Sequence, residues 1–256
     1  RLDEYKVRAS LSDINEMSGR TSNPALTQYI LNNISEYLCD ISGVLVDIGC
    51  GDGSLFAITQ GKENCKFERN VGILPSQDEC DRVTKELKEF SSEILIKKGL
   101  SYDLPCPDNF ANAVVINGVL LILDDREKVI RSIQEVHRIS NPSAIAYFGE
   151  MPFVNEKEGV TYGDSILGWL LYVLKNRGLY QFFLKVIYVL RCLFTKEIFL
   201  ILPKNKGSWF GVKEFEGILE SFGFQIMESF QHKEIDAFGK VSLSKTRWNY
   251  VAKVIK

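Results

Sequence analysis

The sequence predicts an α/β fold built on a doubly wound, mostly parallel seven-stranded sheet, with a helical insertion after the fifth strand. Three observations lead to this prediction. An apolar strand runs directly into a glycine-rich turn and a helix over residues 44–60. Strands and amphipathic helices then alternate up to residue 148, which is typical of parallel βαβ units. A long apolar segment at 155–206 separates this part from a last helix and two closing strands.

The individual elements follow from hydrophobic periodicity and from residues that favour helix ends. We expect residues 1–43 to form an N-terminal helical lead-in or lid, and the core to comprise 44–154 and 207–256. Pro24 suits the first turn of a helix, with Asn23 as its N-cap. Strands are expected at 44–48, 70–73, 93–97, 112–117, 144–148, 224–230 and 246–254, and helices at 24–39, 54–60, 78–90, 126–139 and in the segment that carries Phe215, Leu219 and Phe222 on one face.

Composition narrows the class of protein. The chain has 256 residues and is 45% apolar, so it can bury one sizeable core with an attached subdomain. A formal net charge of −2 gives no support to a protein that coats nucleic acid, so no nucleic-acid partner is expected. The six cysteines are scattered without C-x-x-C pairs or nearby histidines. This pattern argues against a metal site or a disulfide framework, and it fits a cytoplasmic location.

The glycine-rich turn carries most of the functional information. Gly49, Gly51 and Gly53 allow positive φ and leave no Cβ between the backbone and a ligand. The start of the following helix directs unpaired N–H groups and the positive end of its dipole at the same place. The third glycine comes one residue earlier than in the dinucleotide pattern G-x-G-x-x-G, and the carboxylate of Asp47 would repel a pyrophosphate. A nicotinamide oxidoreductase is therefore disfavoured.

Residues 44–53 instead resemble the first motif of the class I S-adenosylmethionine-dependent methyltransferases, hhDhGxGxG, where h is apolar. Residues 99–108 are similar to that family's G-D-A-x-D-L-P-F-P-D stretch, and 135–144 to its E-x-x-R-V-L-K-P-G-G stretch. The resemblance implies a Rossmann-like methyltransferase fold with S-adenosyl-L-methionine as its cofactor. The residues that would line the cofactor are Asp47, Gly49, Cys50, Gly51, Gly53, Leu74, Pro75, Ser101, Tyr102, Asn117 and Arg20.

The sequence also departs from the family pattern. The family places an acidic residue after its second strand, where it hydrogen-bonds the ribose, and here that position holds Leu74. The aspartate that lies near the adenine in the family is replaced by Leu100. A missing ribose contact could cost on the order of 1–3 kcal/mol in binding, unless Gln77 or Asp78 reaches back to replace it.

Candidates for catalysis are few. Asn117 ends the fourth strand, where ligands bind in open α/β sheets, although an Asx-type strand terminator is the alternative. His232 is expected after the sixth strand, and imidazole titrates near neutral pH, which makes it a candidate general base. Glu150, just past the fifth strand, and Asp164 are alternatives. His137 is expected to be structural.

The apolar segment at 165–202 has two interpretations. On a helical wheel, Gln181, Lys185 and Arg191 share one face, and Phe182, Val186 and Val189 share the other, which predicts an amphipathic helix. One interpretation is a cap over the substrate. The other is a basic surface that makes peripheral contact with an anionic membrane or holds a lipid-linked substrate.

The function predicted from these features is transfer of a methyl group from S-adenosylmethionine to a small-molecule, glycan or lipid-linked acceptor, by O-methylation. In-line methyl transfer requires mainly positioning and desolvation from the protein, so the absence of a strong catalytic constellation says little against activity. The alternative is a catalytically inactive methyltransferase-like scaffold, peripheral at a membrane surface, for which Leu74 and Leu100 argue.

Overall fold

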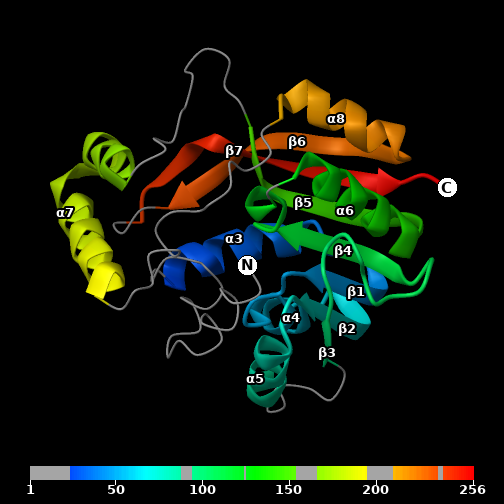
Figure 1. Cartoon of the computed structure of the whole chain (residues 1–256). Coiled ribbons are helices and arrows are strands. Elements are labelled where there is room, and N and C mark those ends of the chain that lie inside the picture. Colours follow the sequence, from blue (N-terminus) through cyan, green and yellow to red (C-terminus); the bar gives the residue numbers. More distant parts are fainter. Residues whose placement is uncertain (1–23, 88–93, 124, 154–165, 195–209, 236–238) are drawn as a thin grey trace. The chain divides into compact units, whose positions relative to one another are not determined.

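The computed structural model describes residues 24–87, 94–123, 125–153, 166–194, 210–235 and 239–256. The chain divides into two compact units. One comprises Arg1–Phe153 and Gly207–Lys256, and the other comprises Val154–Lys206. The first unit holds a sheet with helices on both faces, and the second holds one long helical element (Figure 1).

The first unit is organised around a seven-stranded sheet of order β3-β2-β1-β4-β5-β7-β6. The first five strands are mutually parallel, and β7 runs antiparallel to both β5 and β6. This arrangement confirms the predicted doubly wound, mostly parallel sheet. The strands are β1 (Ser42–Ile48), β2 (Lys66–Leu74), β3 (Ile94–Lys98), β4 (Ala111–Asn117), β5 (Ser140–Pro152), β6 (Phe224–Ile235) and β7 (Val241–Val254).

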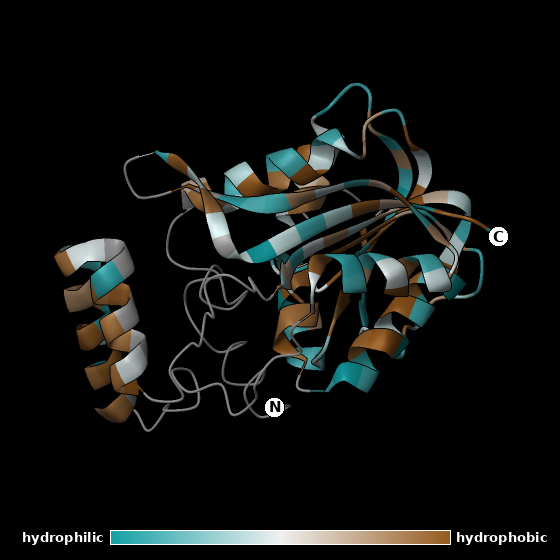
Figure 2. Cartoon of the chain, turned by 90° about the horizontal axis from the view of Figure 1, so that it is seen from above, coloured by the Kyte–Doolittle hydropathy of each residue, from teal (hydrophilic) through white to brown (hydrophobic). Residues whose placement is uncertain are grey.

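Helices cover both faces of the sheet, as its sequence requires. The central strand β4 is almost wholly buried because it packs on both sides, which explains its continuous apolar run. One apolar cluster joins the sheet to α6 (Arg126–Ile139) and α8 (Val212–Ser221). A second cluster joins the opposite face to α3 (Pro24–Glu36), α4 (Ser54–Gln60) and α5 (Gln77–Leu87). Figure 2 shows the polar outer sides of these helices in teal.

Several bounds differ from the prediction. Strands β2, β5, β6 and β7 extend beyond their apolar stretches, because pairing to a neighbouring strand continues into partly exposed residues. The helix expected at 24–39 ends at Glu36, and a turn follows in which Asp40 has φ +63°. The predicted strand ends placed Glu150 and His232 just beyond β5 and β6, and that was wrong: both residues lie within their strands.

The second unit is represented by α7 (Ile166–Phe194). Gly178 has φ +80° and ψ 173°, so the backbone leaves the helical conformation there and two helical segments meet at a kink. Val189 is buried against Ile166, Leu170 and Tyr188, which packs the two segments together. Among the described helices, none is both long and apolar enough to cross a membrane.

Candidate functional site

The glycine turn connects β1 to α4 at the carboxyl end of the central strands. Gly49, Gly51 and Gly53 have φ of +77°, +57° and +77°, so all three adopt the left-handed conformation that glycine tolerates best. The Gly49 N–H donates to the Ile73 carbonyl at 2.8 Å, which ties the turn to the end of β2. The positive φ that the sequence predicts for these three glycines is therefore present in the structure.

Packing around the turn leaves no room for side chains at two of these positions. A Cβ at Gly49 would lie 2.3 Å from a methyl group of Val119, and one at Gly53 would lie 2.6 Å from Leu87. Asp47 is the penultimate residue of β1, close to the turn, and is 5% exposed. Asp52, by contrast, is half-buried, and its carboxylate accepts the Ser54 N–H at 3.0 Å, which supports the start of α4.

The end of β2 lacks a polar side chain at the ribose position. Leu74 is 4% exposed and belongs to the apolar cluster beneath α5, while its backbone carbonyl accepts the Gly99 N–H at 2.9 Å. Pro75 follows and is half-buried. Gln77, one of the two residues considered as substitutes, donates to Asp81 at 2.8 Å along the helix. Leu74 therefore offers no polar side chain at this position, and the side chain of Gln77 is hydrogen-bonded to Asp81 along α5.

Ser76 explains why α5 begins where it does. Its hydroxyl donates to the Glu79 carboxylate at 2.8 Å, and the Glu79 N–H lies 3.3 Å from the same hydroxyl oxygen. This reciprocal arrangement resembles a capping box and satisfies a backbone donor in the first turn. Glu79 is 4% exposed, and its carboxylate and N–H both contact Ser76 at the start of α5.

The loop after β3 carries Ser101 and Tyr102, the predicted adenine neighbours. Ser101 is buried, and the Ser132 hydroxyl of α6 donates to its oxygen at 2.9 Å. Tyr102 is half-buried, with Lys128 and Arg131 5.9 and 6.0 Å from its ring centroid. Both side chains are therefore positioned by α6.

A charged pair on α6 fixes the rest of this loop. The Glu135 carboxylate accepts the Leu104 N–H at 2.7 Å and pairs with Arg138 at 2.7 Å. The Arg138 guanidinium also donates to the Leu104 and Cys106 carbonyls, at 3.1 and 2.8 Å, and to Asp108 at 2.7 Å. Hydrogen bonds from Arg138 hold the pKa of Glu135 below its usual value, and those to Glu135 raise the pKa of Arg138. The sequence identified this pair as a family motif without a role, and the structure assigns it to positioning the loop.

A polar network lies at the carboxyl ends of β4 and β5. The Asn117 amide donates to one oxygen of Glu150 at 3.2 Å, and Arg247 pairs with the other at 2.8 Å. The Glu150 N–H donates to the Asn249 side-chain oxygen at 2.9 Å. Asn249 in turn approaches His232 Nδ1 at 3.3 Å. Two predicted candidates, Glu150 and His232, thus belong to one hydrogen-bonded group.

The geometry gives His232 a defined tautomer. Because the Asn249 oxygen already accepts the Glu150 N–H, its amide nitrogen faces the imidazole and can only donate. His232 Nδ1 is then the acceptor, and the neutral ring carries its proton on Nε2. His232 is 3% exposed, and its role as a general base stays a prediction.

Arg247 and Asn249 were not identified from the sequence. The available signal was the alternation of β7, in which Arg247 and Asn249 alternate with the aromatic residues Trp248 and Tyr250. A charged or amide residue at inward positions of a buried strand is unusual without a partner. Asn249 is 2% exposed, and its partners come from β5 and β6, which no local pattern reveals.

Most of the predicted site residues meet at one edge of the sheet. The glycine turn, Leu74, Ser101, Asn117 and Glu150 follow or end β1 to β5, and these strands are parallel, so their carboxyl ends share that edge. Arg20 and Asp164 lie outside the described residues. Within the described part of the chain, no group of histidine, cysteine and carboxylate side chains could hold a metal ion.

Comparison with known proteins agrees with this architecture. Residues 46–148 match a family model described as a methyltransferase domain. This stretch, which is less than half of the chain, is therefore similar to a methyltransferase domain. A search of curated proteins finds no match.

Solved structures extend the likeness in fold to most of the chain. The N-methyltransferase NodS from Bradyrhizobium japonicum, in complex with S-adenosyl-L-homocysteine, has a TM-score of 0.59 at 14% identity, covering 100% of this chain and 98% of that one. A SAM-dependent methyltransferase from Methanosarcina mazei has a TM-score of 0.53 at 19% identity, covering 87% and 97%. The [4+2]-cyclase SpnF has a TM-score of 0.58 at 16% identity, covering 93% and 84%. At these identities the likeness establishes the fold.

Proposed function

We propose that this chain is an S-adenosylmethionine-dependent methyltransferase that methylates a hydroxyl group of a small-molecule, glycan or lipid-linked acceptor. The observation that carries the proposal is the glycine turn, with three left-handed glycines beside the nearly buried carboxylate of Asp47. Such a turn lets the backbone approach a ligand closely at the carboxyl end of the central strand.

The residues present fit the cofactor at one end better than at the other. Asp47 and the turn from Gly49 to Gly53 would hold the methionine part, whereas Leu74 offers no acceptor to the ribose. When bound, the cofactor supplies an electrophilic methyl group. The protein's contribution is then to place an acceptor oxygen in line with that group and to exclude water.

The network around Glu150 supports placing the acceptor at the ends of β4 and β5. Arg247 and Asn117 hold the two carboxylate oxygens, and the Asn249 contact holds the backbone. A carboxylate fixed in this way can orient an acceptor hydroxyl through a hydrogen bond. His232 would support this arrangement through Asn249.

A second function, binding or assembly without methyl transfer, is favoured by Leu74. A buried leucine at the ribose position removes a contact that could be worth about 1–3 kcal/mol, or roughly tenfold to a hundredfold in affinity. SpnF, described as a cyclase, illustrates that similarity of fold leaves the reaction open.

Isothermal titration with S-adenosylmethionine and S-adenosylhomocysteine tests the proposal. We expect micromolar binding by the native chain and loss of at least tenfold in affinity for Asp47→Ala, because the carboxylate lies beside the turn. Asp81→Ala is the matched control, since Asp81 is an exposed carboxylate on α5. A folded native chain that binds neither compound at millimolar concentration would favour the function without methyl transfer.

A further inference from the structure

The second segment of α7 has an unusual distribution of apolar side chains. Gln181 and Lys185, which share the polar face of the predicted helical wheel, are half-buried. Apart from Arg191, the described exposed side chains of this segment are large and apolar: Phe194 is 87% exposed and Tyr180 is 70% exposed. The full set is Leu179, Tyr180, Phe183, Leu184, Ile187, Leu190, Leu193 and Phe194.

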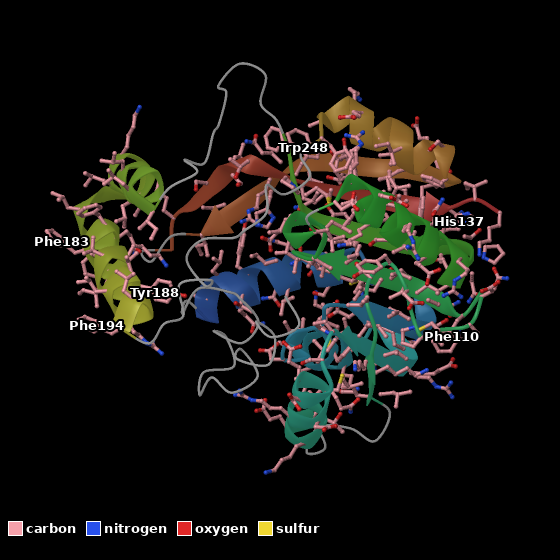
Figure 3. All side chains as sticks on the ribbon, viewed as in Figure 1. Phe110, His137, Phe183, Tyr188, Phe194 and Trp248 are labelled. Atoms are coloured by element: carbon pink, nitrogen blue, oxygen red, sulfur yellow. The ribbon has the colours of Figure 1, made fainter. Side chains whose placement is uncertain are left out.

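These residues form one surface, which we call the α7 apolar face. They recur at intervals of three and four residues, so they lie on the same side of the helix. The opposite side is occupied, because Val189 packs against Ile166 and Leu170 of the first segment. Figure 2 shows much of α7 in brown, and Figure 3 labels Phe183 and Phe194 of this face. A contiguous exposed apolar surface of this kind marks an interaction site.

The charge of α7 as a whole bears on the kind of partner that this face would bind. Within α7 the sequence has Lys175, Arg177, Lys185 and Arg191 and no aspartate or glutamate. Between residues 166 and 206 there are seven lysines and arginines against one acid, Glu197, although the whole chain has a net charge of −2. The positive charge of this part of the sequence is therefore not balanced by acidic residues, and Lys175 and Arg191 are exposed on α7. Exposed apolar residues bordered by basic ones are typical of helices that lie on anionic lipid surfaces.

We propose that the α7 apolar face docks on an anionic membrane surface. Its aromatic and aliphatic side chains enter the boundary between headgroups and acyl chains, and the basic side chains contact lipid phosphates. A second copy of the chain would also cover the apolar residues, but it would bring four more positive charges against the first four. Charge complementarity thus favours lipid over self-association. The proposal is independent of cofactor binding.

Vesicle flotation with the full chain tests this docking. We expect binding to vesicles of phosphatidylcholine and phosphatidylserine, and much weaker binding to phosphatidylcholine alone. Phe183→Ser/Ile187→Ser should reduce the binding at least tenfold, because it removes two exposed apolar side chains from the face. Met227→Ser/Leu243→Ser is the matched control, since these residues are equally exposed but lie on β6 and β7.

A second pair of variants tests the role of charge. Lys175→Gln/Arg191→Gln should weaken binding about fivefold per charge removed, whereas Lys66→Gln/Lys98→Gln in the sheet unit should not. Circular dichroism verifies that each variant is folded. The proposal is overturned if the native chain binds neither vesicle, or if the Phe183→Ser/Ile187→Ser variant binds as well as the native chain. A concentration-dependent dimer without vesicle binding would also overturn it and would identify a second copy as the occupant.

Discussion

Glu150 combines an unfavourable backbone conformation with a carboxylate that is held by several hydrogen bonds. Its φ is +56°, in the left-handed region that costs a residue with a side chain about 1–2 kcal/mol. The strain is held in place by the Asn249 side chain, which accepts the Glu150 N–H, and by a bulge in the pairing of β5 with β7. Backbone strain of this kind clusters at functional sites, where the surrounding structure maintains it.

Glu150→Gln should therefore impair methyl transfer without impairing cofactor binding. The amide keeps the size of the side chain but removes its charge, so the ion pair with Arg247 and the orientation of an acceptor hydroxyl are lost. We expect transfer from radiolabelled S-adenosylmethionine to fall about 100-fold, within the range of a positioned polar group. Titration with S-adenosylhomocysteine should give the affinity of the native chain.

Glu127→Gln provides the control for this substitution, because Glu127 is exposed in the first turn of α6. Equal transfer by Glu150→Gln and the native chain would remove Glu150 from the acceptor site. A parallel loss of cofactor affinity would indicate that the network supports the glycine turn instead.

At this scale the sequence predicted some site residues and missed others for a physical reason. The glycines at 49, 51 and 53 were recognisable because their conformational role depends on their own backbone. The role of Asn249 depends on contacts with Glu150 and His232, which precede it in the chain by 99 and 17 residues. No local sequence pattern contains these contacts. The function of Glu150 and His232 in catalysis stays a prediction.

At the scale of elements, α6 acts as the support for the loop between β3 and β4. Ser132 reaches Ser101, and Arg138 reaches three backbone or carboxylate oxygens between Leu104 and Asp108. A loop without regular structure thus obtains its partners from a neighbouring helix, which satisfies backbone groups that would otherwise be left unpaired. Ser101 and Tyr102 are thereby held near the edge of the sheet where the glycine turn lies.

Arg138→Met should lower the free energy of unfolding by about 2–4 kcal/mol, because the change leaves Glu135 and two carbonyls without their charged donor. Methionine preserves much of the side-chain volume, so the loss reports mainly on hydrogen bonding. Urea denaturation followed by circular dichroism measures the change. Arg82→Met, which breaks an i,i+4 pair with Glu86 on α5, should cost no more than about 1 kcal/mol.

A similar loss in the two variants would show that the network of Arg138 has no more value than a surface ion pair.

The alternation of strands and helices was predictable, since each element buries an apolar stripe with its own period. Element ends were less so: β5 continues to Pro152 because β7 pairs with it beyond the apolar stretch. The exposed side of α7 was also not predictable, because the wheel alone does not say which face Ile166 and Leu170 cover.

At the scale of the whole molecule, the insertion leaves and re-enters the sheet unit at one place. Phe153 and Phe210 form a parallel bridge, and the Phe210 N–H donates to the Pro152 carbonyl at 3.4 Å. Aromatic contacts strengthen both ends: Phe153 packs against Trp248, and Phe210 against Phe215. Trp248 is labelled in Figure 3. Adjacent ends of this kind are typical of a segment inserted into a complete fold.

This arrangement predicts that the sheet unit folds without residues 154–206. A chain in which about eight glycine and serine residues replace them closes a short loop at small entropic cost. We expect a cooperative unfolding transition within a few degrees of the native one, because the two apolar clusters of the sheet contain none of residues 166–194, the part of the excised segment that the structure describes. Titration should find the S-adenosylhomocysteine affinity of the native chain, and vesicle flotation should find no binding. An excised chain that fails to fold while Phe183→Ser/Ile187→Ser remains stable would show that the insertion contributes to the core, and retained vesicle binding would place the lipid contact on the sheet unit.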